Sequence, residues 1–257
     1  MKILGIDSSG LVASVAVAED GVLLGEYTTN YKKTHSQTLL PMLDELKKMI
    51  ELDLGTLDAI AISAGPGSFT GLRIGSATAK GLGLALDKPL VEVPTLEGLA
   101  YNLWGCSDLV CPIMDARRNQ VYTGIYEFTE ELADGMAESG SNAAKECVKA
   151  LRVVMDQTAM DVRDLLRELE KLGRNVIFLG DGVAVYRSVI REECRVPFSF
   201  APAHMNAQRA GAIAALGEVY FAQGKVVSAD EHGPEYLRKS QAEREKEERG
   251  KGSADGV

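Results

Sequence analysis

The stretch Ser63-Ala64-Gly65-Pro66-Gly67-Ser68-Phe69-Thr70-Gly71-Leu72-Arg73-Ile74-Gly75 joins one apolar segment, residues 58–63, to another, residues 72–86. This order predicts a strand, a glycine-rich turn and a helix. The turn is not a P-loop, because lysine and a hydroxyl residue do not follow its last glycine. Its glycine spacing also differs from the dinucleotide-binding fingerprint. Two interpretations remain open: the turn holds an anion at the helix N-terminus, or it brings the helix close to a neighbouring element.

Small residues recur every four positions along the predicted helix, at Gly71, Gly75, Ala79 and Gly83. A glycine inside a helix costs about 1 kcal/mol relative to alanine, so a close contact has to offset that cost. We expect a helix of a partner protein to pack on this stripe, while Leu72 and Leu84 face the chain's own sheet. The alternative is that the stripe packs against the chain's own predicted helix at residues 95–103. The expected interface also includes the neighbouring helix at residues 34–49, and its residues are Thr34, His35, Thr38, Met42, Gly71, Ile74, Gly75, Thr78, Ala79, Leu82 and Gly83.

The segments on either side of this stretch predict a duplicated α/β fold. Three strands open the chain, the second and third joined at Asp20-Gly21, which is a strong hairpin signal. The first hundred residues predict the order βββαβαβα, with strands at 2–7, 12–18, 22–28, 58–63 and 90–93 and helices at 34–50, 72–86 and 95–103. The second half partly repeats this order, with strands at 109–115, 120–128, 147–155 and 175–179 and helices at 162–172, 183–191 and 206–221.

We therefore predict two lobes, residues 1–104 and 105–238, each a mixed sheet flanked by helices. Residues 129–147 contain glycine, serine, asparagine and several acids, and predict an inserted loop. Residues 239–257 carry almost no apolar side chains and predict a solvated, disordered tail.

Composition excludes several classes of protein. Hydrophobic residues make up 46% of the 257 residues, which excludes disorder of the whole chain. The apolar stretches are too short to cross a membrane, and the N-terminus turns polar too early for a signal peptide. The four cysteines lack metal-site spacing and fit free thiols, so we expect a cytoplasmic protein. A net charge of −9 predicts weak binding of nucleic acid by the chain alone.

The end of the first predicted strand carries a candidate nucleotide site. Asp7, Ser8 and Ser9 follow apolar residues, and such a turn can present a carboxylate and backbone N–H groups to phosphates. Gly65 and Gly67 of the glycine-rich turn are candidates for the same site, and Gly180-Asp181-Gly182 for a turn near a nucleotide base. An ordinary strand-to-turn transition explains these residues equally well. The three histidines, His35, His204 and His232, lie far apart in sequence, so we predict no metal site.

Several motifs together resemble the bacterial TsaB family, also called YeaZ. They are residues 2–9, His35-Ser36-Gln37 with residues 39–42, the run from Ser63 to Gly75, residues 93–100 and residues 234–238. The resemblance implies the actin-like ATPase (ASKHA) fold and a role in making threonylcarbamoyladenosine in tRNA, at the adenine 3′ of the anticodon. It implies a subunit that pairs with the paralogue TsaD, which carries out the transfer, while the ATPase TsaE joins the assembly. ATP or ADP and metal are then expected to bind to the partner subunits, and tRNA is expected to bind only to the assembled complex. The chain is expected to be able to form a homodimer when the partner is missing.

The resemblance also predicts that the chain is not itself a catalyst. TsaD-like proteins carry two metal-binding histidines four residues apart, and the matching positions here are Thr95 and Leu99. Neither side chain is a nitrogen ligand, so we expect no stoichiometric transition metal and no catalysis by the chain alone. The principal alternative is an active actin-fold ATPase or phosphotransferase that uses Asp7 and the glycine-rich turn. A metallopeptidase is disfavoured by the missing ligands.

Overall fold

The computed structural model describes residues 1–31, 33–132 and 147–237. Its first sheet, sheet A, has the strand order β3-β2-β1-β4-β5. The strands are β1 (Lys2–Asp7), β2 (Ala13–Glu19), β3 (Val22–Thr29), β4 (Ala59–Gly65) and β5 (Leu90–Pro94). β1 pairs antiparallel with β2 and parallel with β4. Asp20 and Gly21 adopt positive φ angles of 50° and 78° between β2 and β3, which confirms the predicted hairpin turn.

The second sheet, sheet B, has the order β10-β9-β6-β7-β8, which in reverse matches sheet A strand for strand. The strands are β6 (Leu109–Asp115), β7 (Gln120–Leu132), β8 (Cys147–Asp161), β9 (Val176–Leu179) and β10 (Phe198–Phe200). β6 pairs antiparallel with β7 and parallel with β9, as β1 does with β2 and β4. The predicted duplicated α/β fold is therefore confirmed, and the short strand β10, which the sequence did not predict, completes the second copy.

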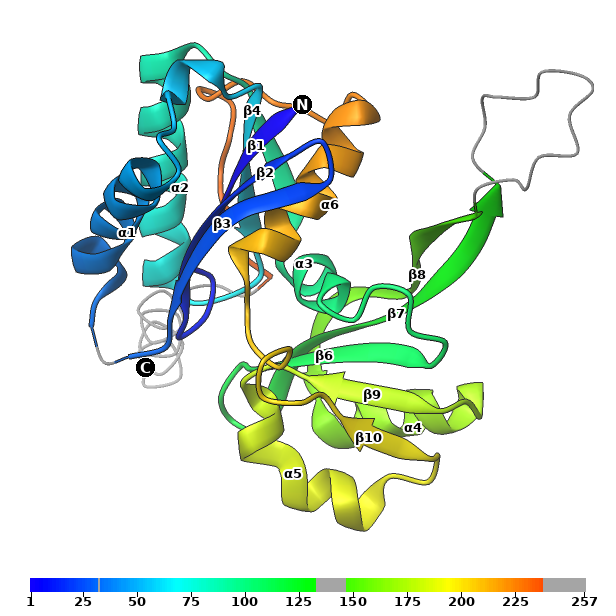
Figure 1. Ribbon diagram of the computed structural model, residues 1–257. Coiled ribbons are helices and arrows are strands. Elements are labelled where there is room, and N and C mark those ends of the chain that lie inside the picture. Colours follow the sequence, from blue (N-terminus) through cyan, green and yellow to red (C-terminus); the bar gives the residue numbers. More distant parts are fainter. Residues whose placement is uncertain (32, 133–146, 238–257) are drawn as a thin grey trace, which may run out of the picture.

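Helices cover both faces of sheet A because its central strands are apolar on both faces. Leu4 and Ile6 pack with α1 residues, whereas Ile3 packs with α6 residues. Gly5 leaves room for the backbone of α6, where a Cβ atom would overlap the carbonyl oxygen of Ala210. The helices are α1 (His35–Met49), α2 (Phe69–Leu86), α3 (Thr95–Tyr101), α4 (Val162–Leu172), α5 (Gly182–Glu193) and α6 (Ala210–Ala222). Figure 1 shows α1 and α2 on one side of sheet A and α6 on the other.

The third helix of each half lies between the lobes. α3 contacts β6 and β7 of sheet B, and α6 packs on sheet A although it belongs to the second half of the sequence. α6 thus covers sheet A, the sheet of the first predicted lobe, although its residues fall within the second predicted lobe, 105–238. The reason is that the apolar face of α6 is needed to cover the second face of sheet A.

Several predicted boundaries differ from the structure, and α2 begins at Phe69 rather than at residue 72. β8 extends to Asp161 rather than to residue 155, and α6 begins at Ala210 rather than at residue 206. β7 and β8 also take up both ends of the predicted loop at 129–147. The rest of that loop, residues 133–146, and the predicted tail at 239–257 lie outside the described residues. Among the described residues, no helix is long and apolar enough to cross a bilayer.

Candidate functional site

Asp7 ends β1 and is only 1% exposed. Its Oδ1 accepts hydrogen bonds from the backbone N–H of Ser9 at 2.9 Å and from the Ser9 hydroxyl at 2.7 Å. Burial raises the pKa of the Asp7 carboxyl to about 6, and the hydrogen bonds from Ser9 only partly oppose this effect. The carboxylate is therefore held within the chain, away from solvent.

The glycine turn, residues 65–71, covers the loop that follows Asp7. The backbone N–H of Ser68 donates to the carbonyl oxygen of Ser9 at 2.6 Å, and the Ser8 hydroxyl donates to the carbonyl oxygen of Gly71 at 2.8 Å. A Cβ atom on Gly67 would overlap the Ser9 carbonyl, and one on Gly71 would overlap the Ser8 carbonyl. These positions require glycine because two backbone segments meet there. The structure thus brings together the predicted site residues, Asp7, Ser8, Ser9, Gly65 and Gly67. The chain's own backbone covers Asp7, Ser8 and Gly65, whereas Ser9 and Gly67 also line a cavity.

The positions that match the metal-binding histidines are filled by structural residues. Thr95 is fully buried, and its hydroxyl lies 2.8 Å from the Ser63 hydroxyl and accepts the Gly65 N–H at 3.1 Å. Leu99 is fully buried in the apolar cluster between the lobes. Among the described residues, no group of three or more His, Cys, Asp or Glu side chains could hold a metal ion.

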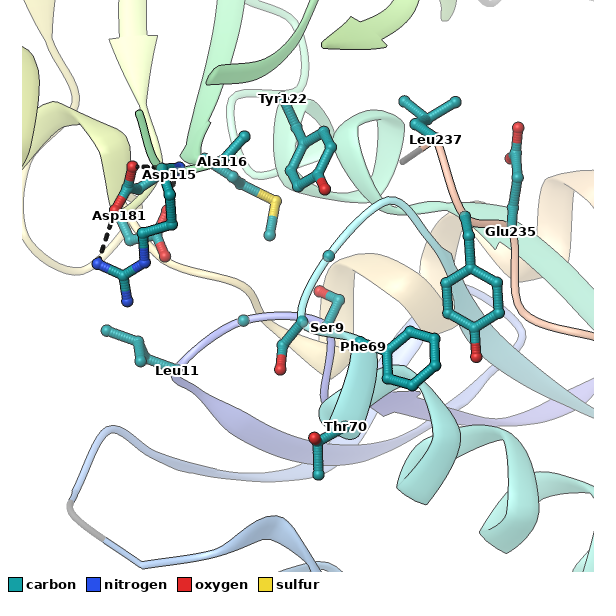
Figure 2. A pocket seen from close by; sticks show the side chains of 16 residues that line it. Ser9, Leu11, Phe69, Thr70, Asp115, Ala116, Tyr122, Asp181, Glu235 and Leu237 are labelled. Carbon is teal, nitrogen blue, oxygen red and sulfur yellow. Dashed lines mark hydrogen bonds and ion pairs between the residues drawn. The ribbon is translucent and has the colours of Figure 1, made fainter. Parts of the chain in front are cut away.

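A cavity of about 390 Å³ separates the two lobes beside this sealed loop. Figure 2 shows Asp115 and Asp181 across the cavity from Glu235. Ser9 and Thr70 line the cavity on the side of sheet A. The Oδ2 atom of Asp115 pairs with Arg117 at 3.0 Å, and Oδ1 of Asp181 accepts the Asp115 N–H at 3.1 Å. Burial raises the pKa of Asp181.

The described lining of the cavity is more acidic than basic. Its lining has three carboxylates, those of Asp115, Asp181 and Glu235, against the single guanidinium of Arg117. That guanidinium already pairs with Asp115. Asp7, the carboxylate expected to face phosphate and metal, does not line the cavity. The chain therefore offers an anionic phosphate group little positive charge here.

The sequence identified Asp181 within Gly180-Asp181-Gly182, but it did not identify Asp115 or Arg117. The feature that marks this turn is visible only in the structure. Three consecutive residues adopt positive φ angles: Arg117 (64°), Arg118 (56°) and Asn119 (60°). Such a run is costly for residues other than glycine and marks a tightly constrained turn.

Comparisons with known proteins point to one family along almost the whole chain. A family model described as "TsaD: tRNA N6-adenosine threonylcarbamoyltransferase" matches residues 22–246. The Bacillus subtilis "tRNA threonylcarbamoyladenosine biosynthesis protein TsaB" is 34% identical over 245 residues, which cover 95% of this chain and 96% of that protein. The chain belongs to the TsaB family. The Escherichia coli protein of the same name is 35% identical over 133 residues, 51% of this chain and 57% of that protein.

Solved structures confirm the fold of the TsaB family for this chain. YeaZ from Pseudomonas aeruginosa superposes with a TM-score of 0.64 at 25% identity, covering 92% of this chain and 99% of that one. A second solved structure, described as an uncharacterized protein with similarity to peptidase YEAZ from Pseudomonas aeruginosa, gives a TM-score of 0.72 at 24% identity over the same shares.

The small-residue stripe faces inward, contrary to the interface prediction. Gly71, Gly75, Ala79 and Gly83 are all buried. Gly75 lies over Ser8 and Ile62, and Gly83 packs against Leu90 and Ala229. The stripe therefore serves close packing on sheet A, the loop after β1 and the C-terminal segment, so neither a partner helix nor the helix at 95–103 occupies it. Leu72 is buried as expected, but Leu84 is 57% exposed and does not face the sheet.

The remaining interface candidates of this TsaB-family chain lie on the outer layer formed by α1 and α2. Thr34 is exposed, and the others are half-buried, namely His35, Thr38, Met42, Ile74, Thr78 and Leu82. The Nε2 atom of His35 lies 2.9 Å from the Gly10 carbonyl oxygen, which fixes the start of α1 against the loop after β1. A groove of about 560 Å³, lined in part by Leu11, Tyr31, His35 and Ile74, opens beside these residues.

Proposed function

We propose that this chain is a non-catalytic assembly subunit in tRNA threonylcarbamoyladenosine biosynthesis, which binds a TsaD paralogue and, through that complex, TsaE. The biosynthetic role rests on the family relationship over 95% of the chain. The observation that supports a non-catalytic role is the sealed carboxylate of Asp7, because the glycine turn fills the place where phosphates would approach it. The buried Thr95 and Leu99 support it further, since the resemblance matches them to two metal-binding histidines of TsaD-like proteins and neither is a nitrogen ligand.

The proposed partner surface is the outer layer of α1 and α2. Large apolar side chains remain exposed there and at its edge, with Tyr31 at 72%, Leu11 at 67% and Leu40 at 54%. Leu11 and Tyr31 line the groove, and Leu40 lies on α1 outside it. Exposed apolar side chains at and near a groove are typical of a protein–protein interface. Two layers of helices would then meet, and a second copy of this chain could use the same surface when the partner is absent.

A matched pair of variants tests this surface. We expect Leu40→Asp to weaken binding of purified TsaD paralogue by roughly 30-fold or more, as for an interface hot spot. Val185→Asp is the control, because Val185 is equally exposed at 54% but lies on α5 in the other lobe. Both variants should keep near-normal melting temperatures, since both side chains are exposed. Calorimetric titration measures the affinity. Equal binding by Leu40→Asp and the parent chain would refute the surface, and no binding by the parent chain would refute the function.

The non-catalytic role is tested separately with the isolated chain. We expect no ATP hydrolysis above background, no stoichiometric zinc or iron by elemental analysis, and only weak, non-specific tRNA binding. ATP and metal are assigned to the partner subunits, and tRNA to the assembled complex. ATP hydrolysis that disappears in Asp7→Ala would instead support the ATPase or phosphotransferase alternative.

A further inference from the structure

Residues 225–237, here called the strap, follow α6 and return along the lobe that contains sheet A (Figure 1). Val227 pairs with Leu90 at the edge of sheet A through two backbone hydrogen bonds of 2.9 Å. Ala229 is 7% exposed and packs against Gly83, where a side chain would leave no room. The first part of the strap is therefore fixed to β5 and to the end of α2.

Polar contacts fix the middle of the strap. His232 is 3% exposed, and its Nδ1 atom lies 2.6 Å from Oε1 of Glu92 on β5. Lys80 of α2 donates to the carbonyl oxygens of Asp230 and His232 at 3.1 and 2.9 Å. Three such contacts together hold this irregular segment against α2 and β5.

The end of the strap rests on the glycine turn. The N–H of Glu235 donates to the Ala64 carbonyl at 2.7 Å, and the Glu235 carbonyl lies against Gly65, whose φ is 127°. The Tyr236 ring packs on Phe69 with a centroid distance of 4.8 Å. The guanidinium of Arg73 lies over the Phe69 ring, 4.0 Å from its centroid. Its Nε atom also donates a hydrogen bond to the Tyr236 hydroxyl at 3.2 Å.

The strap also connects the lobes. Nε2 of Gln157 on β8 donates to Oε2 of Glu235 at 2.9 Å. Glu235, Tyr236 and Leu237 line the cavity between the lobes together with Ser9 and Arg117. The strap thus contacts the glycine turn, and the glycine turn covers the loop after Asp7.

We propose that the strap is a clamp that holds the glycine turn closed over the loop after Asp7. The order of contacts carries this inference. The strap contacts the glycine turn, the turn covers the loop after Asp7, and Ser9 of that loop donates hydrogen bonds to the Asp7 carboxylate. Displacing the strap removes the hydrogen bond at Ala64 and the aromatic stack on Phe69, and the turn is then free to separate from Ser8 and Ser9. The sealed state of Asp7 is in this sense a property of the C-terminal segment and not of the N-terminal motifs alone.

The test uses the full chain with Tyr236→Ala, which removes the aromatic stack and the hydrogen bond to Arg73. We expect amide hydrogen exchange at Ser68 and Gly71 to rise by roughly 10-fold or more, because their bonds to Ser9 and to the Ser68 hydroxyl open more often. Exchange in α4 should stay unchanged. Trp104→Ala is the matched control, since Trp104 is a 53% exposed aromatic residue that donates a hydrogen bond to the Lys149 carbonyl and lies outside the strap, the cavity and the groove.

A second measurement follows the carboxyl group of Asp7 by NMR titration. Water that reaches Asp7 when the turn opens should lower its pKa from about 6 toward the ordinary value of 3.8. If Tyr236→Ala does not fold, Arg73→Ala serves in its place, because it keeps both aromatic rings and removes only the exposed guanidinium. A folded variant with unchanged exchange in the turn and unchanged titration of Asp7 would overturn the clamp. This outcome is independent of whether the chain binds a TsaD paralogue.

Discussion

Gly75→Ala is expected to lower the free energy of unfolding by about 2 kcal/mol, because overpacking of the core costs up to about 3 kcal/mol and the better helix propensity of alanine offsets about 1 kcal/mol of it. A Cβ atom at this position would overlap the Ser8 hydroxyl and lie 3.2 Å from the Ile62 side chain. The Ser8 hydroxyl cannot move freely, because it donates to the Gly71 carbonyl. The substitution would therefore separate α2 from β4 or break the contact that seals the loop after Asp7.

Gly81→Ala is the matched control, with the same substitution in the same helix. Gly81 is exposed, and a Cβ atom there would meet nothing within 4 Å. Alanine is the better helix former, so we expect this variant to be more stable by about 1 kcal/mol. Urea unfolding of both variants measures the difference. If the two substitutions have effects of the same sign, the stripe is not the close contact that we describe.

The stripe also shows how far the sequence predicts the structure. Its spacing of four indicated correctly that a backbone approaches α2 closely, but spacing cannot distinguish a helix from a sheet or a loop. The actual neighbours, Ser8, Ile62, Leu90 and Ala229, come from four separate segments. In contrast, the strands and helices themselves follow from local periodicity and turns, and most were predicted to within a few residues.

Long-range contacts account for what the sequence did not predict. β10 has only three residues and joins sheet B by pairing with β9, so local periodicity is too short to indicate it. The side of α6 that covers sheet A is fixed by contacts with residues more than 100 positions earlier. The same applies to the site: Asp7 was identified from its place after a strand, but its burial depends on the glycine turn and on the strap.

Asp7→Asn is expected to stabilise the chain at neutral pH and to remove part of its pH dependence. In the folded chain the pKa of Asp7 is about 6, against an ordinary value of 3.8. The folded state therefore binds this proton more tightly than the unfolded state, and ionisation of Asp7 opposes folding. The penalty is absent well below pH 4, grows as the pH rises from 4 to 6, and is complete above pH 6. A shift of this size corresponds to about 3 kcal/mol at pH 7.5 and about 1 kcal/mol at pH 4.5.

Asparagine keeps the oxygen that accepts the two hydrogen bonds from Ser9, but it has no charge to desolvate. We therefore expect Asp7→Asn to be more stable than the parent chain by about 3 kcal/mol at pH 7.5 and by only about 1 kcal/mol at pH 4.5. Urea unfolding at the two pH values measures both differences. Asp44→Asn on the exposed face of α1 is the control and should change stability by less than about 0.5 kcal/mol at either pH. A loss of stability in Asp7→Asn at pH 7.5, or a gain that does not depend on pH, would show that the carboxylate has a favourable ionic partner and is not simply buried.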